Sequence, residues 1–309
     1  MLGEHMLPSP DEDFIQFDRD SNHYFIIQEK LDRGIKNFKR WALNTDEPRK
    51  RKLHISLTSF PQRMIDIKYC LYSLMRQTIK PDSITLWLAE DEFPELENSL
   101  PDVVAGFKDN GLSIRWCRDI GPYTKLIPAL REYPEDIIVT ADDDLYYPPT
   151  WLERLYESYL ENPDFVHCHR AHLITLDNAG NIRPYNEWKH CMTNVPASDF
   201  NFATGAGGVL YPPHVLCDEA IKEELFTHLA PTADDVWFWA MAIKKGTKIN
   251  IVPDNIKRLV YINLERELGK SGEAILVKTN VAGGKNDVYV KNVISYCNIK
   301  LVLPAEAPF

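Results

Sequence analysis

The stretch LHISLTSFPQRMIDIKYCLYSLMRQTIKPDSITLWL, residues 53–88, decides the fold of this chain. Its first five residues alternate in polarity as a β-strand does, and residues 83–88 form a second strand-like run. Between these runs, apolar side chains recur at helical spacing from Ile67 to Met75. A strand, a helix and a second strand in this order predict a βαβ unit and therefore a parallel sheet.

The same alternation of strands and helices continues along the chain. The segments expected to extend the unit are strands over 112–116 and 137–140 and helices over 125–132 and 151–160. An amphipathic helix is expected over 24–41, within the N-terminal segment that precedes the unit. From residue 165 onward the pattern is less periodic. We therefore expect an α/β fold in which helices flank a mostly parallel central sheet, with a small additional region from the second half.

Three consecutive carboxylates, Asp142, Asp143 and Asp144, directly follow the predicted buried strand over 137–140. Neighbouring carboxylates repel one another and are costly to bury without partners, so a cation or a dense set of donors is expected there. Mg²⁺ and Mn²⁺ take oxygen ligands and often share them with phosphates, which favours a metal-diphosphate site. The alternative is a solvated acidic turn. Because loops at strand carboxyl ends share one crevice, residues 58–63 should face this run.

A second acidic pair, Asp234 and Asp235, follows the helix-start signals Pro231 and Thr232. Beside bulky aromatic residues, one of these carboxylates could be partly desolvated and act as a general base. The alternative reading is a pair of helix-dipole partners worth ~0.3–1 kcal/mol.

A glycine-rich turn over 205–208 permits close approach of the backbone, and a flat sugar ring could lie on it. It matches no dinucleotide or P-loop motif, and a purely structural turn is the alternative. Lys125 and Arg63 could each offset the charge of a diphosphate in an otherwise acidic site. Both could equally be ordinary solvated side chains.

Composition narrows the class of protein. The chain has 309 residues and a formal net charge of -10, which argues against nucleic-acid binding because phosphate backbones need clustered cations. No apolar run of about 18 residues exists, so we expect no transmembrane helix. The six cysteines are scattered and no leader pattern is present, which favours reduced thiols in a cytoplasmic protein. His167, Cys168 and His169 have no spacing typical of a structural zinc site.

Taken together, these residues resemble glycosyltransferases of the GT-A (Rossmann-like) fold, close to the large inverting family 2. The resemblance covers about 53–253, and its motifs are the strand and loop 55–63, the helix segment 71–78, Asp142–Asp144, Gly205–Gly208 and Asp234–Asp235. Asp142–Asp144 falls on the family's Asp-x-Asp metal motif, and Asp234–Asp235 on its acidic pair before an aromatic helix. The loop from Thr58 to Arg63 also resembles bacterial capsule and lipopolysaccharide transferases.

The resemblance implies a nucleotide-sugar donor, most often a UDP-sugar, held through its diphosphate by Mn²⁺ or Mg²⁺. It implies that Asp144 contacts the metal, that Asp142 contacts the ribose or the metal through water, and that Asp235, or else Asp234, is the base. The implied donor-binding residues are Thr58, Phe60, Arg63, Lys125, Asp142 and Asp143. The implied acceptor-side residues are Gly207, Gly208 and Trp237. No C-terminal Gln-x-x-Arg-Trp motif is found, so His214 or the pair Asn286–Asp287 could complete the site instead.

We expect an N-terminal appendage or linker over 1–52, a catalytic domain over 53–253 and a C-terminal extension over 254–309 that packs on it. The domain would divide into a nucleotide-binding half, 53–164, and an acceptor half, 165–253. The expected acceptor is a glycan or a lipid-linked saccharide. If the protein associates peripherally with a membrane, we expect it at the inner face. The chain could also be one module of a larger transferase. The alternatives are a sugar-nucleotide pyrophosphorylase and a non-catalytic carbohydrate-binding module.

Overall fold

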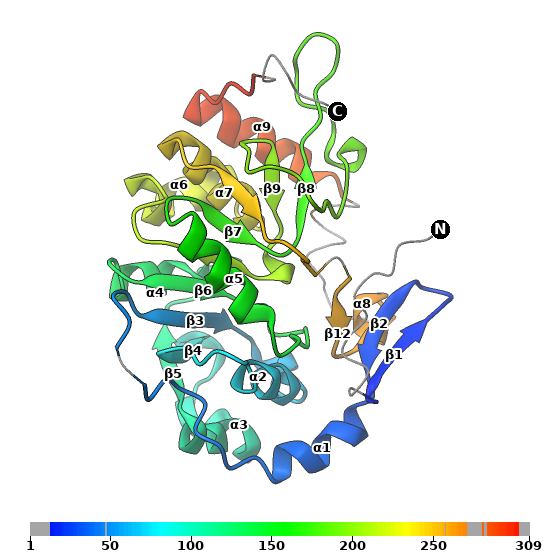
Figure 1. Ribbon diagram of the computed structural model, residues 1–309, viewed down its shortest axis with the longest axis vertical. Helices are drawn as coiled ribbons and strands as arrows, with labels where there is room; N and C mark the ends of the chain where they lie inside the picture. The colour runs from blue at the N-terminus through cyan, green and yellow to red at the C-terminus, as the bar shows by residue number, and fades with distance from the viewer. Residues whose placement is uncertain (1–12, 47, 257, 271–279, 281–282, 303–309) are drawn as a thin grey trace.

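A seven-stranded mixed sheet runs through the centre of the protein, in the strand order β11-β7-β10-β6-β3-β4-β5 (Figure 1). The computed structural model describes residues 13–46, 48–256, 258–270, 280 and 283–302. The strands of this sheet are β3 (Leu53–Thr58), β4 (Ser83–Ala89), β5 (Leu112–Cys117), β6 (Ile137–Thr140), β7 (Val166–Cys168), β10 (Val209–Tyr211) and β11 (Ile249–Ile251).

The first half of the sheet is parallel, as the βαβ pattern predicts. Strand β3 pairs in parallel with both β4 and β6, and β4 pairs in parallel with β5. Strand β10 is antiparallel to its neighbours β6 and β7, whereas β11 is parallel to β7. Strands β3 and β6 are buried along nearly their whole length, and most of their residues are apolar or β-branched. The predicted α/β class with a mostly parallel central sheet is confirmed.

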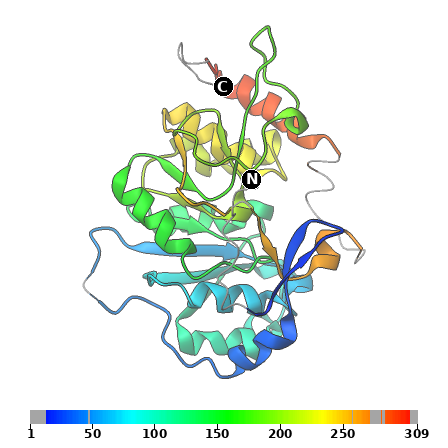
Figure 2. The same ribbon diagram turned by 45° about the vertical axis from the view of Figure 1, so that its right-hand side comes forward.

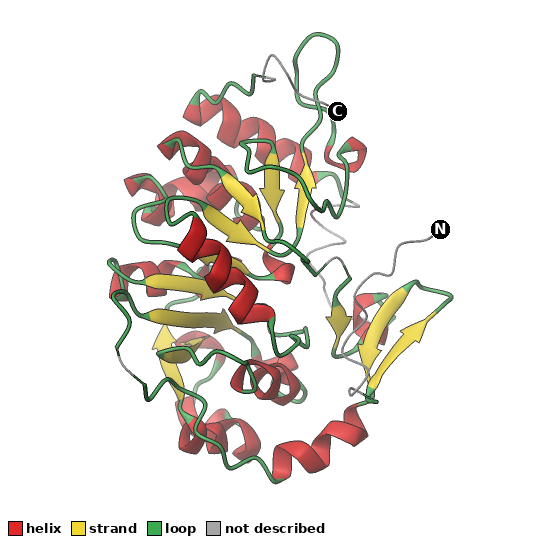
Figure 3. Ribbon diagram, viewed as in Figure 1, coloured by secondary structure: helices red, strands yellow, loops and turns green. Residues whose placement is uncertain are grey.

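Helices cover this sheet (Figure 3). The helices of its first half are α2 (Ile67–Met75), α3 (Asp102–Gly106), α4 (Ile127–Glu132) and α5 (Trp151–Glu161). The predicted helix over 67–75 matches α2, and α5 ends one residue beyond the predicted helix over 151–160. Helix α4 begins later than expected because Pro128 occupies its first turn and residues 121–125 form a separate helical turn.

The N-terminal strands and a strand from the later part of the chain meet in a second, three-stranded sheet, in which β2 lies between β1 and β12 (Figure 2). Its strands are β1 (Ile15–Asp18), β2 (His23–Ile26) and β12 (Val260–Tyr261). The helix predicted over 24–41 is wrong at both ends, since residues 24–26 belong to β2 and helix α1 covers only Gln28–Lys36. Tyr24 and Phe25 pair with strands on both sides, and this non-local pairing overrides the local periodicity.

The remaining elements form one end of the molecule, at the top of Figure 1. They are the two-stranded sheet of β8 (Ala171–Leu173) and β9 (Asn201–Ala203) and the helices α6 (Glu223–Leu229), α7 (Asp234–Lys245) and α9 (Lys285–Cys297). Helix α9 buries Tyr289, Val290 and Val293 in the core cluster that contains α7. Among the described residues, no helix is long and apolar enough to span a membrane. The division into domains drawn from the sequence stays a prediction.

Candidate active site

The acidic run Asp142–Asp144 and the loop after β3 lie at the same edge of the central sheet. Because β3 and β6 are parallel neighbours, with Ser56 opposite Thr140, the segments that follow them emerge side by side. Arg63 Nη1 lies 2.8 Å from Asp144 Oδ2 and 3.4 Å from Asp143 Oδ1. The Ser59 hydroxyl donates a short hydrogen bond to the Asp143 carboxylate. The predicted juxtaposition of these two loops is therefore present in the fold.

A buried lysine joins the acidic run to the second acidic pair. Lys125 Nζ donates to Asp142 Oδ1 at 2.7 Å and lies 3.1 Å from Asp234 Oδ2. The contact with Asp234 is an ion pair without hydrogen-bond alignment, because that oxygen is buried and accepts no aligned hydrogen bond. Burying an ammonium is costly unless carboxylates surround it, so these contacts explain how Lys125 can be 8% exposed.

The glycine turn closes around the same lysine. The backbone N–H of Gly205 donates to Asp235 Oδ1 at 2.9 Å. A Cβ atom at position 205 would lie 2.8 Å from Lys125 Nζ and 2.9 Å from Asp235 Oδ1, so only glycine fits without displacement. Helix α7 begins at Asp234, which places both carboxylates of the pair in its first turn. The two acidic motifs and the glycine turn thus form one cluster.

The cluster holds more carboxylates than cations. Its acidic members are Asp142, Asp143, Asp144, Asp234 and Asp235. Of the cations in the described ranges, only Arg63 and Lys125 lie within ion-pair distance of them. Burial, with repulsion from Asp234, raises the pKa of Asp235 to about 7. Burial likewise raises the pKa of Asp143 to about 7, against the opposing charge of Arg63. The site therefore has negative charge that its own cations do not neutralise.

The donor set fits a divalent ion that is shared with a ligand. Asp142 and Asp144 have side chains 27% and 30% exposed, against 11% for Asp143, so they are the accessible oxygens of the run. Among the described residues, no three acidic, histidine or cysteine side chains surround a common point. A Mg²⁺ or Mn²⁺ ion bound by one or two carboxylates takes its other ligands from phosphates and water, which suits this arrangement.

The other residues predicted to bind the donor lie close to this cluster. Thr58 Oγ1 donates to the Trp87 carbonyl oxygen at 2.9 Å. The Arg63 guanidinium carbon lies 5.4 Å from the centre of the Phe60 ring, so Phe60 covers one face of this cation. Arg63 is itself 8% exposed and faces the carboxylates. It supports the acidic run, in addition to whatever contact it makes with a ligand.

The three residues predicted on the acceptor side are packed against neighbouring side chains. Trp237 is fully buried and donates to the Ala220 carbonyl oxygen at 3.0 Å, which leaves no side-chain surface for an acceptor. Gly208 has a φ of 90°, and a Cβ there would lie 2.3 Å from Trp151 Nε1. A Cβ at Gly207 would meet Arg170 at 2.6 Å. These residues pack the interior, and Gly205 is the glycine that borders the carboxylates.

His214 and Asp287, proposed as substitutes for a C-terminal motif, have partners outside the acidic run. His214 follows β10, which is antiparallel to β6, so it lies at the opposite edge of the sheet and pairs with Glu135 at 3.1 Å. Asp287, at the start of α9, accepts a hydrogen bond from the Tyr185 backbone at 2.6 Å.

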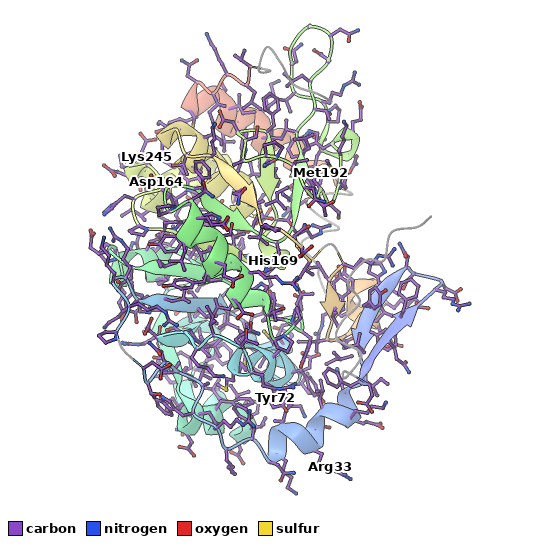
Figure 4. All side chains as sticks on the ribbon, in the orientation of Figure 1. Arg33, Tyr72, Asp164, His169, Met192 and Lys245 are labelled. Carbon is purple, nitrogen blue, oxygen red and sulfur yellow. The ribbon has the colours of Figure 1, made fainter. Side chains whose placement is uncertain are left out.

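Figure 4 labels His169, whose Nε2 donates to the Trp151 carbonyl of α5 at 2.9 Å. His167 is similarly held by Asn162 and Ser158.

Residues from β12, α8 and the segment after the acidic run support this site, and no local sequence pattern indicated them. The backbone N–H of Ile262 donates to the Asp144 carbonyl oxygen at 3.0 Å, just after β12. In helix α8 (Leu264–Glu267), Arg266 Nη1 lies 3.2 and 2.9 Å from the two Asp66 carboxylate oxygens, and both side chains are buried. Tyr147 is a further support, because its hydroxyl accepts from the Asp142 N–H at 2.8 Å.

Comparisons with known proteins give a likeness at the level of architecture. No protein-family model matches the chain, and no curated protein matches it either. One similar solved structure is a mannosyltransferase from Pyrobaculum calidifontis in complex with GDP-Man and Mn²⁺, at 15% identity and a TM-score of 0.43, over 86% of this chain and 79% of that one. Another is 4-diphosphocytidyl-2C-methyl-D-erythritol synthase, at 13% identity and a TM-score of 0.44, over 72% and 98%.

Proposed function

We propose that this protein is a metal-dependent, inverting glycosyltransferase that moves a sugar from a UDP-sugar to a hydroxyl of a glycan or lipid-linked saccharide. The convergence of Asp142 and Asp234 on Lys125 supports this function, because it sets two acidic motifs in one cluster at the sheet edge where α/β proteins bind ligands. The likeness of loop 58–63 to bacterial surface-polysaccharide transferases supports a role in that synthesis.

In this proposal the acidic run holds the donor. Asp144 and Asp142 would hold a Mn²⁺ or Mg²⁺ ion, which would neutralise charge on the leaving diphosphate. Ser59 and Arg63 keep the carboxylates of the run in place, and the ring of Phe60 supplies an apolar wall. Lys125 adds a fixed positive charge between donor and acceptor.

Asp235 is the better candidate for the general base. Its Oδ1 accepts from Gly205 and its side chain is partly exposed, whereas Asp234 is buried against Lys125. A pKa near 7 suits a base that works near neutral pH. Asp235 would take the proton of the acceptor hydroxyl as that oxygen attacks the anomeric carbon. The bond from that carbon to the diphosphate oxygen breaks, and UDP leaves with the electron pair from the opposite face.

Calorimetry with UDP, with and without Mn²⁺, tests the donor side. Wild type should bind UDP more tightly with Mn²⁺, and Asp144→Ala should lose that gain. Asp235→Asn should keep it but lose sugar transfer and hydrolysis across a panel of nucleotide sugars. Asp164→Asn, at an exposed position away from the cluster, is the matched control. Full transfer by both folded variants contradicts the mechanism, and glycan binding indifferent to UDP and Mn²⁺ identifies a non-catalytic module.

A further inference from the structure

Arg170 is a cation without an acidic partner beside the proposed base. It lies between β7 and β8, is partly buried, and its Nη1 donates to Thr204 Oγ1 at 2.9 Å. Across the described part of the chain, no carboxylate lies within the 4.0 Å ion-pair distance of its guanidinium. Arg170 therefore carries a partly buried positive charge beside a cluster that has excess carboxylates.

The backbone fixes the position of this guanidinium relative to Asp235. The Thr204 N–H donates to the Arg170 carbonyl oxygen at 2.9 Å, and the next residue, Gly205, donates to the Asp235 carboxylate. Arg170 and Asp235 are thus held by successive residues of one turn. The packing of Arg170 against Gly207 leaves no space for a Cβ there, which further restricts the turn.

The charge of Arg170 acts on the same neighbouring groups as the charges of the acidic motifs. Burial raises the pKa of Tyr185, Asp235 raises it further, and Arg170 lowers it. Burial and Glu267 raise the pKa of Tyr261, on which Arg170 and Asp144 act in opposite directions. Burial, with the charge of Arg170, lowers the pKa of His172 and His190, so these rings add no competing positive charge near neutral pH. Among the described residues, Arg170 and Lys125 are therefore the two cations at this corner of the site.

We propose that Arg170 binds an anionic group, a carboxylate or a phosphate, on the acceptor saccharide, next to the hydroxyl that Asp235 deprotonates. This inference rests on the proposed function and names its acceptor class as acidic. An arginine suits such a ligand because its planar fork matches carboxylate and phosphate oxygens in two parallel hydrogen bonds. The acceptor side is favoured over the donor because Thr204 and Gly205 connect Arg170 to the base, whereas the donor carboxylates lie across Lys125.

Binding of paired small saccharides to the full chain tests the inference, with UDP and Mn²⁺ present. Glucuronate and glucose 6-phosphate should each bind wild type at least about tenfold more tightly than glucose, and Arg170→Gln should remove this preference. Arg170→Lys should retain part of it. Arg183→Gln, which removes a partly exposed arginine paired with Glu187, should leave it unchanged. Comparing the two acidic probes distinguishes a carboxylate from a phosphate ligand.

Several outcomes would overturn the inference. One is that wild type binds the acidic and neutral saccharides equally, or binds neither detectably. Another is that Arg170→Gln still prefers the acidic saccharides over glucose. Weakened UDP binding in that variant with an intact acidic preference would assign Arg170 to the donor. If Arg170 only supports the turn, Thr204→Val should abolish the preference as fully as Arg170→Gln does. Mn²⁺-dependent UDP binding reports separately on the proposed function, so either idea can fail without the other.

Discussion

Lys125 donates a hydrogen bond to Asp142 across 2.7 Å, with side chains 10% and 27% exposed. The same ammonium neutralises Asp234 from the opposite side, at 3.1 Å. Two acidic motifs from distant parts of the chain are therefore held by one buried cation, which makes this residue central to both the stability and the electrostatics of the cluster.

Removal of that cation should be strongly destabilising. Lys125→Met would leave Asp142 and Asp234 without their positive partner, and loss of one member of a buried pair costs about 3–5 kcal/mol. Urea denaturation measures the change in the free energy of unfolding. The double variant with Asp234→Asn should recover part of the loss because it also removes an unpaired carboxylate. A Lys125→Met protein as stable as wild type would contradict the proposed role of this pair.

The Arg266–Asp66 pair should be a main attachment of helix α8 to the start of helix α2. Both side chains are buried, at 5% and 6% exposed, so Arg266→Met should lower the free energy of unfolding by about 3–5 kcal/mol. Arg183→Met is the control, since its pair with Glu187 is much more exposed and should contribute about 0.5 kcal/mol or less. Equal effects of the two substitutions in chemical denaturation would show that the buried pair adds no special stability.

Two glycine substitutions should separate function from stability. In Gly205→Ala the new methyl group meets the ends of the Lys125 and Asp235 side chains, so it should disturb the base and lower donor turnover at least about tenfold. Gly208→Ala should mainly destabilise, because φ is positive there and the methyl meets the fixed ring of Trp151. Gly106→Ala, with nothing within 4 Å, is the control. Unchanged turnover in Gly205→Ala would contradict this assignment.

The buried ring of His172 should lower the free energy of unfolding as the pH falls. Burial, with the charges of Arg170 and His190, lowers its pKa to about 3, and its Nδ1 accepts from the Cys191 N–H at 3.1 Å. As pH falls below about 6.5, the unfolded chain binds a proton that the folded protein excludes, so wild type loses stability. The His172→Gln variant lacks this loss.

The stability difference between wild type and His172→Gln should therefore shift by about 1 kcal/mol against wild type from about pH 6 to about pH 5. The comparison cancels the other titrating groups, including Asp143 and Asp235, whose raised pKa values act in the opposite sense. Denaturation curves at the two pH values give the result. A difference that stays constant or changes in favour of wild type would show that His172 accepts a proton in the folded state.

The parts of the fold that were predictable depend on neighbours in sequence. Alternation over 53–57 and helical spacing over 67–75 identify β3 and α2, because each side chain's face is set by the local period. Asp142–Asp144 could be placed at a strand end for the same reason. The helix over 24–41 failed because β2 is stabilised by pairing with β1 and β12, which no local pattern records.

The sequence by itself determined that a parallel α/β sheet presents Asp142–Asp144 and the loop after β3 at one edge, since the parallel direction of the strands follows from the βαβ pattern. Tertiary structure alone decided which cations meet those carboxylates, that Gly205 is the glycine beside them, and that Trp237 fills the interior. The physical reason is that periodicity fixes only the face of a side chain. The partner on that face comes from distant segments, chosen by packing and by the need to neutralise buried charge.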